Sequence, residues 1–136
     1  MREIKEVPLS VVWQMRHEIM YPDEAFEVVK LDSDPKGIHL GLYDDDKLVS
    51  VISLFLESGR LQFRKFCTKR REQGKGYGSY LLKHVFETFA PQYQAKAIWC
   101  NARTTAVAIY EKFGMQKTPH AYQKFGFDFV IMEKAL

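Results

Sequence analysis

The order of apolar and polar residues along the chain predicts alternating strands and helices. A short strand at residues 2–7 ends at Pro8, and Ser10 is the expected N-cap of a helix over residues 11–20. Apolar residues recur at helical spacing in that helix and form one stripe: Val12, Met15, Ile19 and Met20. Residues 21–30 predict one or two further helical turns, and the composition of residues 31–37 is that of a loop.

The middle of the chain predicts three consecutive strands joined by tight turns. Residues 38–43 alternate between apolar and other positions, "DDDK" makes a turn, and residues 48–56 form a mostly buried strand. The stretch "ESGR" turns the chain into a third strand at residues 61–68. In that strand Leu61, Phe63 and Cys67 alternate with polar neighbours, which indicates one buried and one open face.

The second half begins with a glycine-rich stretch, "REQGKGYGS" at residues 71–79, placed before a helix of about four turns that stops near Pro91. A strand at residues 95–100 and a helix follow, with Thr104 as its expected N-cap and Gly114 as the expected residue after its end. Two more strands close the chain. This order, β-α-(α)-β-β-β-α-β-α-β-β, predicts a mixed α/β fold instead of a repeated βαβ unit.

Length and composition narrow the possible classes of function. A chain of 136 residues fits one domain over residues 1–136, and its net charge of +3 is small for a nucleic-acid-binding protein. We find no apolar run of about 18 residues and no signal-peptide pattern, so we expect no membrane contact and a cytoplasmic location. Cys67 and Cys100 match no metal motif and are expected to be free thiols, with no metal bound.

The glycine-rich stretch has three possible interpretations as a phosphate site. A Walker A loop needs a hydroxyl after its lysine, but Gly76 follows Lys75. A dinucleotide fingerprint needs a third glycine where Ser79 stands, and a carboxylate after the next strand. The third pattern, Arg/Gln-x-x-Gly-x-Gly/Ala between a strand and a helix, fits fully from Arg71 to Gly76. There, backbone N–H groups and the helix dipole direct positive potential at a pyrophosphate.

With this motif the chain resembles the GCN5-related N-acetyltransferases, the GNAT family. A second family pattern, Ala-x-x-x-Tyr-x-x-x-Gly-Phe, matches at Ala106, Tyr110 and Gly114, with Met115 in place of the usual Phe. The order of elements also matches from end to end. The resemblance implies the GNAT acyl-CoA N-acyltransferase fold: a central, mostly antiparallel sheet, splayed between strands 4 and 5 and flanked by about four helices.

The resemblance also implies acetyl-CoA as co-substrate and assigns residues to it. The backbone of the fourth strand's end would bind the pantetheine arm, and the N–H groups of the glycine loop, with Arg71, would bind the pyrophosphate. Tyr110 lies beside the cofactor sulfur in the family and would protonate the leaving thiolate. Asn101 and Arg103 are further candidates, although the family usually has Asn where Arg103 stands. The complete cofactor-binding set is Phe66, Cys67, Thr68, Arg71, Gln73, Gly74, Lys75, Gly76, Tyr77, Gly78, Ser79, Asn101, Arg103 and Tyr110.

The acceptor side is less defined by the sequence. A general base is needed because only a neutral amine can attack the thioester, and Glu57 is our candidate, with His39 and His120 as alternatives. The acceptor would be a small-molecule or peptide amine, and the acidic segment at residues 18–34 suits a cationic one. Pairing of the last strands between subunits would give a homodimer. Two other functions stay open at this point: a non-catalytic coenzyme A-binding sensor, and an RNA-binding protein that uses the basic loop.

Overall fold

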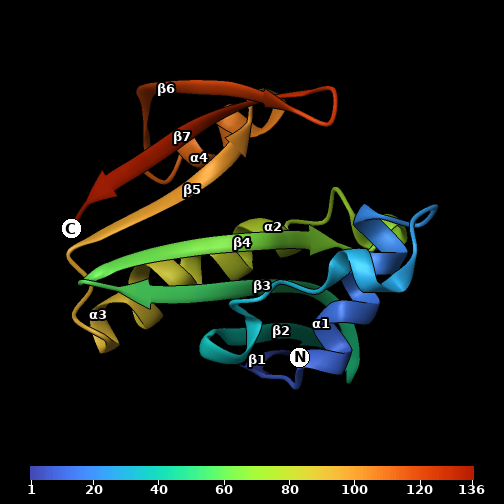
Figure 1. Cartoon of the computed structure of the whole chain (residues 1–136). Helices are drawn as coiled ribbons and strands as arrows, with labels where there is room; N and C mark the ends of the chain where they lie inside the picture. Colours follow the sequence, from blue (N-terminus) through green and yellow to red (C-terminus); the bar gives the residue numbers. More distant parts are fainter. The chain divides into compact units, whose positions relative to one another are not determined.

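The computed structural model describes all residues from 1 to 136, and its elements follow the predicted order (Figure 1). The strands are β1 (Arg2–Glu6), β2 (Ile38–Asp44), β3 (Lys47–Glu57), β4 (Arg60–Thr68), β5 (Ala97–Arg103), β6 (Gln116–Lys124) and β7 (Phe127–Ala135). The α-helices are α1 (Leu9–Met15), α2 (Tyr77–His84), α3 (Ala90–Gln92) and α4 (Val107–Glu111). Two π-helical segments, η1 (Arg16–Met20) and η5 (Val85–Phe89), extend α1 and α2. Short 3-10 turns are η2 (Phe26–Val29), η3 (Asp34–Lys36), η4 (Arg70–Glu72) and η6 (Thr104–Ala106).

The residues group into two compact units. Unit 1 comprises residues 1–55 and 65–82, and unit 2 comprises residues 56–64 and 83–136. The core of unit 1 contains Val7, Val12, Met15, Val51 and Cys67. Buried side chains of unit 2 include Leu61, Phe63, Val85, Ile98, Val130 and Met132. The expectation that residues 1–136 form a single domain stays a prediction.

The strands form a mixed sheet to which β4 contributes in both units. In unit 1 the order is β1-β2-β3-β4, and β1, β2 and β3 pair antiparallel. In unit 2 the order is β4-β5-β7-β6, in which Arg60–Gln62 pair in parallel with Ala97–Trp99 and the other pairs are antiparallel. The predicted α/β class with a mostly antiparallel sheet is therefore confirmed. The expected splay between β4 and β5 stays a prediction.

The first helix differs from the prediction at both ends. It begins at Leu9 with Pro8 as N-cap, and the Val11 N–H donates to the Pro8 carbonyl at 3.0 Å, so the prediction of Ser10 as the cap is wrong. Pro8 has extended backbone, with φ −69° and ψ 161°, and no side chain caps this helix. At the other end the Tyr21 N–H bonds to the Arg16 carbonyl, five residues earlier, at 3.0 Å, which is the π-helical pattern.

The last helix is shorter than predicted. β5 runs on through Arg103 and the α-helix begins only at Val107, so the prediction of Thr104 as its N-cap is wrong. The end of the helix is as predicted. Gly114 has φ +88°, its N–H bonds to the Glu111 carbonyl, and the next N–H reaches the Tyr110 carbonyl. This is a Schellman ending, in which glycine takes the left-handed conformation without steric cost.

The helix after the glycine loop ends near Pro91, as predicted. Pro91 lies inside α3, and the chain leaves helical geometry after Gln92. The π-helical segment Val85–Phe89 comes directly before this point. Since Pro91 is at the start of α3, its missing N–H leaves no hydrogen bond of that short helix unmade.

Candidate functional site

The glycine-rich loop of unit 1 leaves its backbone open. Gly74 and Gly76 have φ values of +80° and +84°, and a Cβ added at either would have no atom within 4 Å. Helix α2 begins directly after them, at Tyr77. Left-handed glycines before a helix start expose N–H groups that, together with the helix dipole, attract a phosphate. The geometry of the loop fits the pyrophosphate site expected from the sequence.

The phosphate-binding pattern of this loop can be aligned with the sequence in a second way, two residues further along. The pattern Arg/Gln-x-x-Gly-x-Gly also matches from Gln73 to Gly78, because a third glycine follows Gly76 at the same spacing. A Cβ at Gly78 would lie 3.1 Å from the Phe66 ring, so α2 packs closely on β4 there. The Gln73 side chain donates to the Thr68 carbonyl at 3.0 Å and joins the loop to the same strand. The sequence analysis used only the register from Arg71, and the third glycine was the signal for the other.

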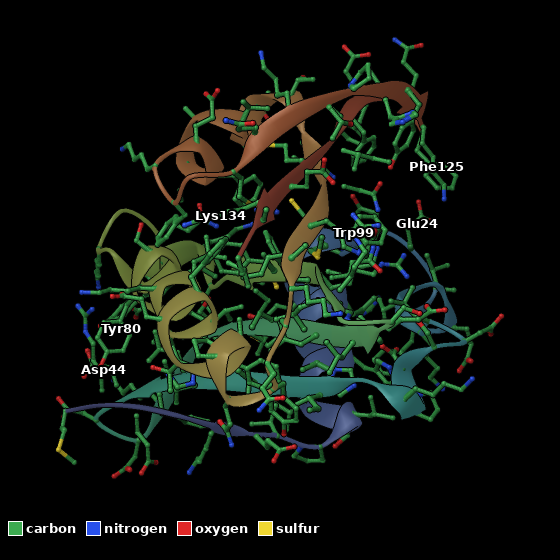
Figure 2. The ribbon with its side chains drawn as sticks, turned by 90° about the vertical axis from the view of Figure 1, so that its left-hand side faces the viewer. Glu24, Asp44, Tyr80, Trp99, Phe125 and Lys134 are labelled. Carbon is green, nitrogen blue, oxygen red and sulfur yellow. The ribbon has the colours of Figure 1, made fainter.

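Tyr77 anchors the start of α2 to β2. Its hydroxyl donates a hydrogen bond to the Asp44 carboxylate, which raises the pKa of the phenol and lowers the pKa of the carboxyl. The Arg2 guanidinium lies 4.7 Å from the centre of the Tyr77 ring and 4.9 Å from that of Tyr80. Figure 2 labels Asp44, which accepts the Tyr77 hydrogen bond, and Tyr80, which packs against Arg2. The sequence analysis considered only the backbone of Tyr77 and missed this function of its side chain.

The end of β4 carries the backbone groups expected to bind pantetheine. The Ser50 hydroxyl donates to the Cys67 carbonyl at 2.9 Å, so one lone pair of that oxygen is already used. Burial raises the pKa of the Cys67 thiol to about 12, which leaves the thiol protonated and unreactive at neutral pH. Lys65, two residues earlier, has φ +53°, a left-handed conformation that is unusual inside a strand.

A cavity of about 590 Å³ lies in unit 1 between the end of the first helix and the start of the glycine loop. Its lining residues come from two short segments: Glu18, Ile19, Pro22 and Asp23 from the first, and Lys69, Arg70, Arg71 and Glu72 from the second. Glu72 forms an ion pair with Lys75 at 3.0 Å. The other charged lining residues form no ion pair within 4.0 Å.

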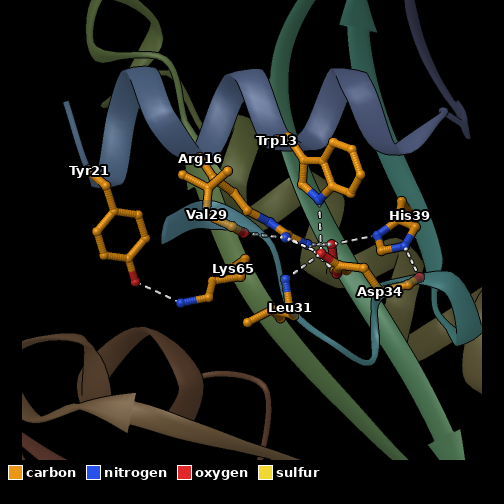
Figure 3. Close-up of polar contacts among 9 residues, drawn as sticks. Trp13, Arg16, Tyr21, Val29, Leu31, Asp34, His39 and Lys65 are labelled. Carbon is orange, nitrogen blue, oxygen red and sulfur yellow. Dashed lines mark hydrogen bonds and ion pairs between the residues drawn. The ribbon is translucent and has the colours of Figure 1, made fainter. Parts of the chain in front are cut away.

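A fully buried ion pair holds the helical segment beside this cavity (Figure 3). The Arg16 guanidinium donates to both carboxylate oxygens of Asp34, at 2.8 and 3.0 Å, and to the Val29 carbonyl at 2.9 Å. The Trp13 indole N–H adds a bond of 2.9 Å to the same carboxylate. Burial alone would raise the pKa of Asp34, but the bonds from Arg16, Trp13 and the Leu31 N–H lower it to about 2.

Tyr110 lies on α4 in unit 2. Its ring meets the Phe63 ring edge-on, with 5.4 Å between the ring centres. Burial raises the pKa of the Tyr110 phenol, and the nearby Cys100 raises it further. The phenol therefore keeps its proton at neutral pH, as a proton donor must. Lys134 supports this helix, because its ammonium group donates to the Phe113 carbonyl at 3.0 Å.

The remaining candidates lie on the strands. Asn101 and Arg103 are exposed on β5, and the Arg103 guanidinium lies 4.0 Å from the centre of the Phe127 ring. Glu57 is exposed at the end of β3. His120 is exposed within β6. Both ring nitrogens of His39 are hydrogen-bonded, to Ser53 Oγ at 2.7 Å and to the Asp34 carbonyl at 2.9 Å, which makes it a structural residue.

Comparison with known proteins identifies the family. The GNAT acetyltransferase domain matches residues 10–136. The chain belongs to the GNAT family. The resemblance seen in the glycine loop and around Tyr110 is thereby confirmed at the level of the family, while the individual roles of those residues stay predictions.

Relatives of this GNAT protein are found in sequence and in structure. The uncharacterised N-acetyltransferase YitI of Bacillus subtilis is 27% identical over 146 residues, covering 100% of this chain and 97% of its own. The spermine/spermidine N(1)-acetyltransferase of Bacillus subtilis is 32% identical over 98 residues, 61% of this chain and 64% of its own. The match between the structure and that of a candidate N-acetyltransferase from Lactobacillus plantarum has a TM-score of 0.88 at 23% identity, covering 99% and 98% of the two chains.

A Bacillus subtilis acetyltransferase solved in complex with CoA has the same fold, with a TM-score of 0.76 at 17% identity and coverage of 99% of this chain and 97% of its own. Together with the family match, these relatives define the activity: this GNAT protein transfers an acetyl group from acetyl-CoA to an amine. Of the functions that the sequence left open, the family match and the relatives support this activity.

Two further observations concern the whole chain. No group of three or more His, Cys, Asp or Glu side chains is placed to hold a metal ion. The expectation that no metal takes part stays a prediction. None of the helices combines the length and the apolar character needed to cross a membrane.

Proposed function

We propose that the acetyl group passes directly from acetyl-CoA to a primary amine, with no acetylated enzyme intermediate. The buried thiol of Cys67 supports direct transfer, because a pKa of about 12 makes it a poor nucleophile. The single observation that carries the proposal is the open glycine loop at the start of α2, where Gly74 and Gly76 leave room for a pyrophosphate. Acetyl-CoA supplies the activated acyl group as a thioester.

The loop and strand residues of this chain would bind the co-substrate. N–H groups from Gln73 to Ser79 would donate to the pyrophosphate, with the Arg71 guanidinium adding positive charge. Backbone groups of Phe66, Cys67 and Thr68 would pair with the pantetheine arm, as an added strand does at a sheet edge. Asn101 and Arg103 are the candidates on β5. The pattern Arg/Gln-x-x-Gly-x-Gly fits the loop from Gln73 to Gly78 as well as from Arg71 to Gly76, and we propose both alignments equally.

The reaction needs two proton transfers. The lone pair of the neutral amine attacks the thioester carbonyl carbon, and the carbon–sulfur bond breaks as the tetrahedral intermediate collapses. The sulfur takes a proton from the Tyr110 hydroxyl, which recovers it from solvent. The amine loses one proton to a general base, for which Glu57 is our candidate, either directly or through water. Burial raises the pKa of Tyr110, which keeps the phenol protonated but makes it a weaker acid, so the proposed role rests on the position of Tyr110 in the family motif.

The acceptor would be a small-molecule or peptide amine. The spermine/spermidine acetyltransferase relative supports an acceptor of small size, over the 61% of this chain that it matches. Two buried free cysteines support a reducing, cytoplasmic environment. The edge strand β6, whose residues are mostly exposed, supports pairing between two copies of the chain. We propose no nucleic-acid partner, in keeping with the net charge of +3.

A thiol-release assay tests the proposed function. Purified protein is mixed with acetyl-CoA and a panel of primary amines, and free thiol is followed with a colorimetric reagent. We expect thiol release with at least one amine and a matching acetylated product by mass spectrometry. Calorimetry with coenzyme A runs in parallel. Tight binding of coenzyme A with no thiol release from any amine would contradict the proposal and favour the non-catalytic sensor.

A further inference from the structure

The cavity in unit 1 has two walls of opposite charge. One wall, from the end of the first helix, includes the acidic residues Glu18 and Asp23. The other wall, from the start of the glycine loop, includes the basic residues Lys69, Arg70 and Arg71. None of these five side chains is neutralised by an ion pair within 4.0 Å. Charged groups that face one cavity without partners of their own are suited to binding charged groups of a ligand.

The co-substrate can satisfy only one of the two walls. Coenzyme A carries phosphates, which suit basic side chains, but it carries no ammonium group that could pair with Glu18 and Asp23. Arg71 is the member of the basic wall that we assign to the pyrophosphate. Lys69 and Arg70 on one side, and the two carboxylates on the other, are left for a second ligand.

The net charge of the lining distinguishes between classes of acceptor. With Glu72 included, 3 basic and 3 acidic residues line the cavity, so the net charge of the lining is zero. A polyamine carries only positive charge and would meet the basic wall with repulsion, whereas a zwitterion would satisfy both walls. We infer that this cavity selects an amine that also carries a carboxylate, namely a free amino acid. This inference rests on the proposed function and specifies its acceptor.

The acidic wall is held firmly enough to discriminate between ligands. Glu18 lies on the π-helical segment η1, whose first residue is Arg16 in its buried ion pair with Asp34. Tyr21, between the two wall carboxylates in sequence, accepts a hydrogen bond of 2.7 Å from the Lys65 ammonium, as Figure 3 shows. The same ammonium lies 4.9 Å from the centre of the Tyr21 ring. A π-helical turn tied down at both ends is a common device for presenting a functional side chain.

Equilibrium binding tests the inference independently of turnover. Lysinamide carries a neutral amide in place of the carboxylate of lysine, and putrescine is ornithine without its carboxylate. Calorimetry with the full chain in the presence of coenzyme A should give a dissociation constant about tenfold lower for lysine than for lysinamide, as expected for a charge-assisted contact. Ornithine should bind more tightly than putrescine by a similar factor. Arg70→Gln should remove both preferences, and Lys47→Gln, which removes one exposed cation from β3, should keep them.

Each other outcome would overturn the inference. Equal binding of lysine and lysinamide and of ornithine and putrescine, or tighter binding of putrescine than of ornithine, would show that the cavity does not recognise a carboxylate. A preference that survives in Arg70→Gln would place its origin elsewhere. A lasting preference for amino acids together with weaker coenzyme A binding in Arg70→Gln would assign the basic wall to the co-substrate alone. Thiol release from putrescine, combined with binding of putrescine as tight as that of ornithine, would uphold the proposed acetyl transfer and refute the preference for a zwitterion.

Discussion

The Tyr77 hydroxyl donates a hydrogen bond to the Asp44 carboxylate and so joins the glycine loop of unit 1 to strand β2. Tyr77 is the first residue of α2, directly after Gly76. Any rotation of this helix end would move the N–H groups that we assign to the pyrophosphate. The side chain of Tyr77 is therefore a positioning element for the loop, in addition to any bond its backbone makes.

Removing this hydroxyl should weaken acetyl-CoA binding without affecting the acceptor. Tyr77→Phe loses one hydrogen bond, for which about 1 kcal/mol is typical, so KM for acetyl-CoA should rise about fivefold. KM for the amine should stay constant in steady-state thiol-release kinetics. Tyr80→Phe is the matched control, because this neighbouring ring also packs against Arg2. Equal changes in both KM values, or in both variants, would refute a specific role for Tyr77.

The conformation of Gly76 predicts a cost for any side chain there. Gly76→Ala forces alanine to φ +84°, which costs about 1 kcal/mol, and places a methyl group against the bound phosphate. Acetyl-CoA binding measured by calorimetry should weaken about tenfold or more. Gly126→Ala is the control: Gly126, between β6 and β7, has φ +79° and is equally free of neighbours. That variant should lose similar stability in urea yet bind acetyl-CoA normally, and the prediction fails if the two variants bind alike.

Replacing Tyr110 should slow the chemical step. A general acid typically contributes about a hundredfold or more, so Tyr110→Phe should lower kcat by about that factor and leave KM for acetyl-CoA nearly unchanged. Tyr93→Phe, on a half-exposed ring that stacks on Phe89 in the same unit, is the control. Unchanged thiol release in Tyr110→Phe would remove this residue from the mechanism.

The buried carboxylate of Asp34 should make stability depend on acid pH. Its pKa is lowered from 3.8 to about 2, so the folded state gains stability above pH 4 that disappears as the pH falls to about 2. The loss is about 2 kcal/mol for this group. Urea unfolding at several pH values between 6 and 2 measures it. Asp34→Asn should be less stable by about 3 kcal/mol at pH 6, because Arg16 loses its partner, and its stability should depend less on pH in this range. Parallel pH curves for both proteins would contradict this assignment.

Local patterns in the sequence predicted most of the fold. The alternation of Leu61, Phe63 and Cys67 predicted β4, and the spacing from Tyr110 to Gly114 predicted the end of α4. The helix starts were predicted less well, because a cap can be formed by Pro8 as well as by the hydroxyl of Ser10. Which residue becomes the N-cap depends on the backbone path of the preceding strand, and no single residue specifies that path.

Contacts between distant segments were beyond the reach of the sequence. Arg16 lies within the apolar stripe of the first helix, and nothing near it in the sequence indicates that it pairs with Asp34. Asp34 lies in a segment that was predicted as a loop and forms a 3-10 turn. The charged cavity likewise joins residues 18–23 to residues 69–72. Glycine motifs can be recognised in a sequence because a left-handed backbone conformation favours glycine at a single position. A side-chain pair or a cavity depends on two distant positions, and a single sequence does not show which positions meet.

The segments of the two units alternate along the chain. Each consists of two separate segments, and the chain passes between them within β3, within β4 and within α2. A fragment that ends at residue 82 contains all of unit 1 but also residues 56–64 of unit 2, so a single cut of the chain cannot separate one unit from the other. The glycine loop lies in one unit and Tyr110 in the other, so any experiment that examines both needs the full chain.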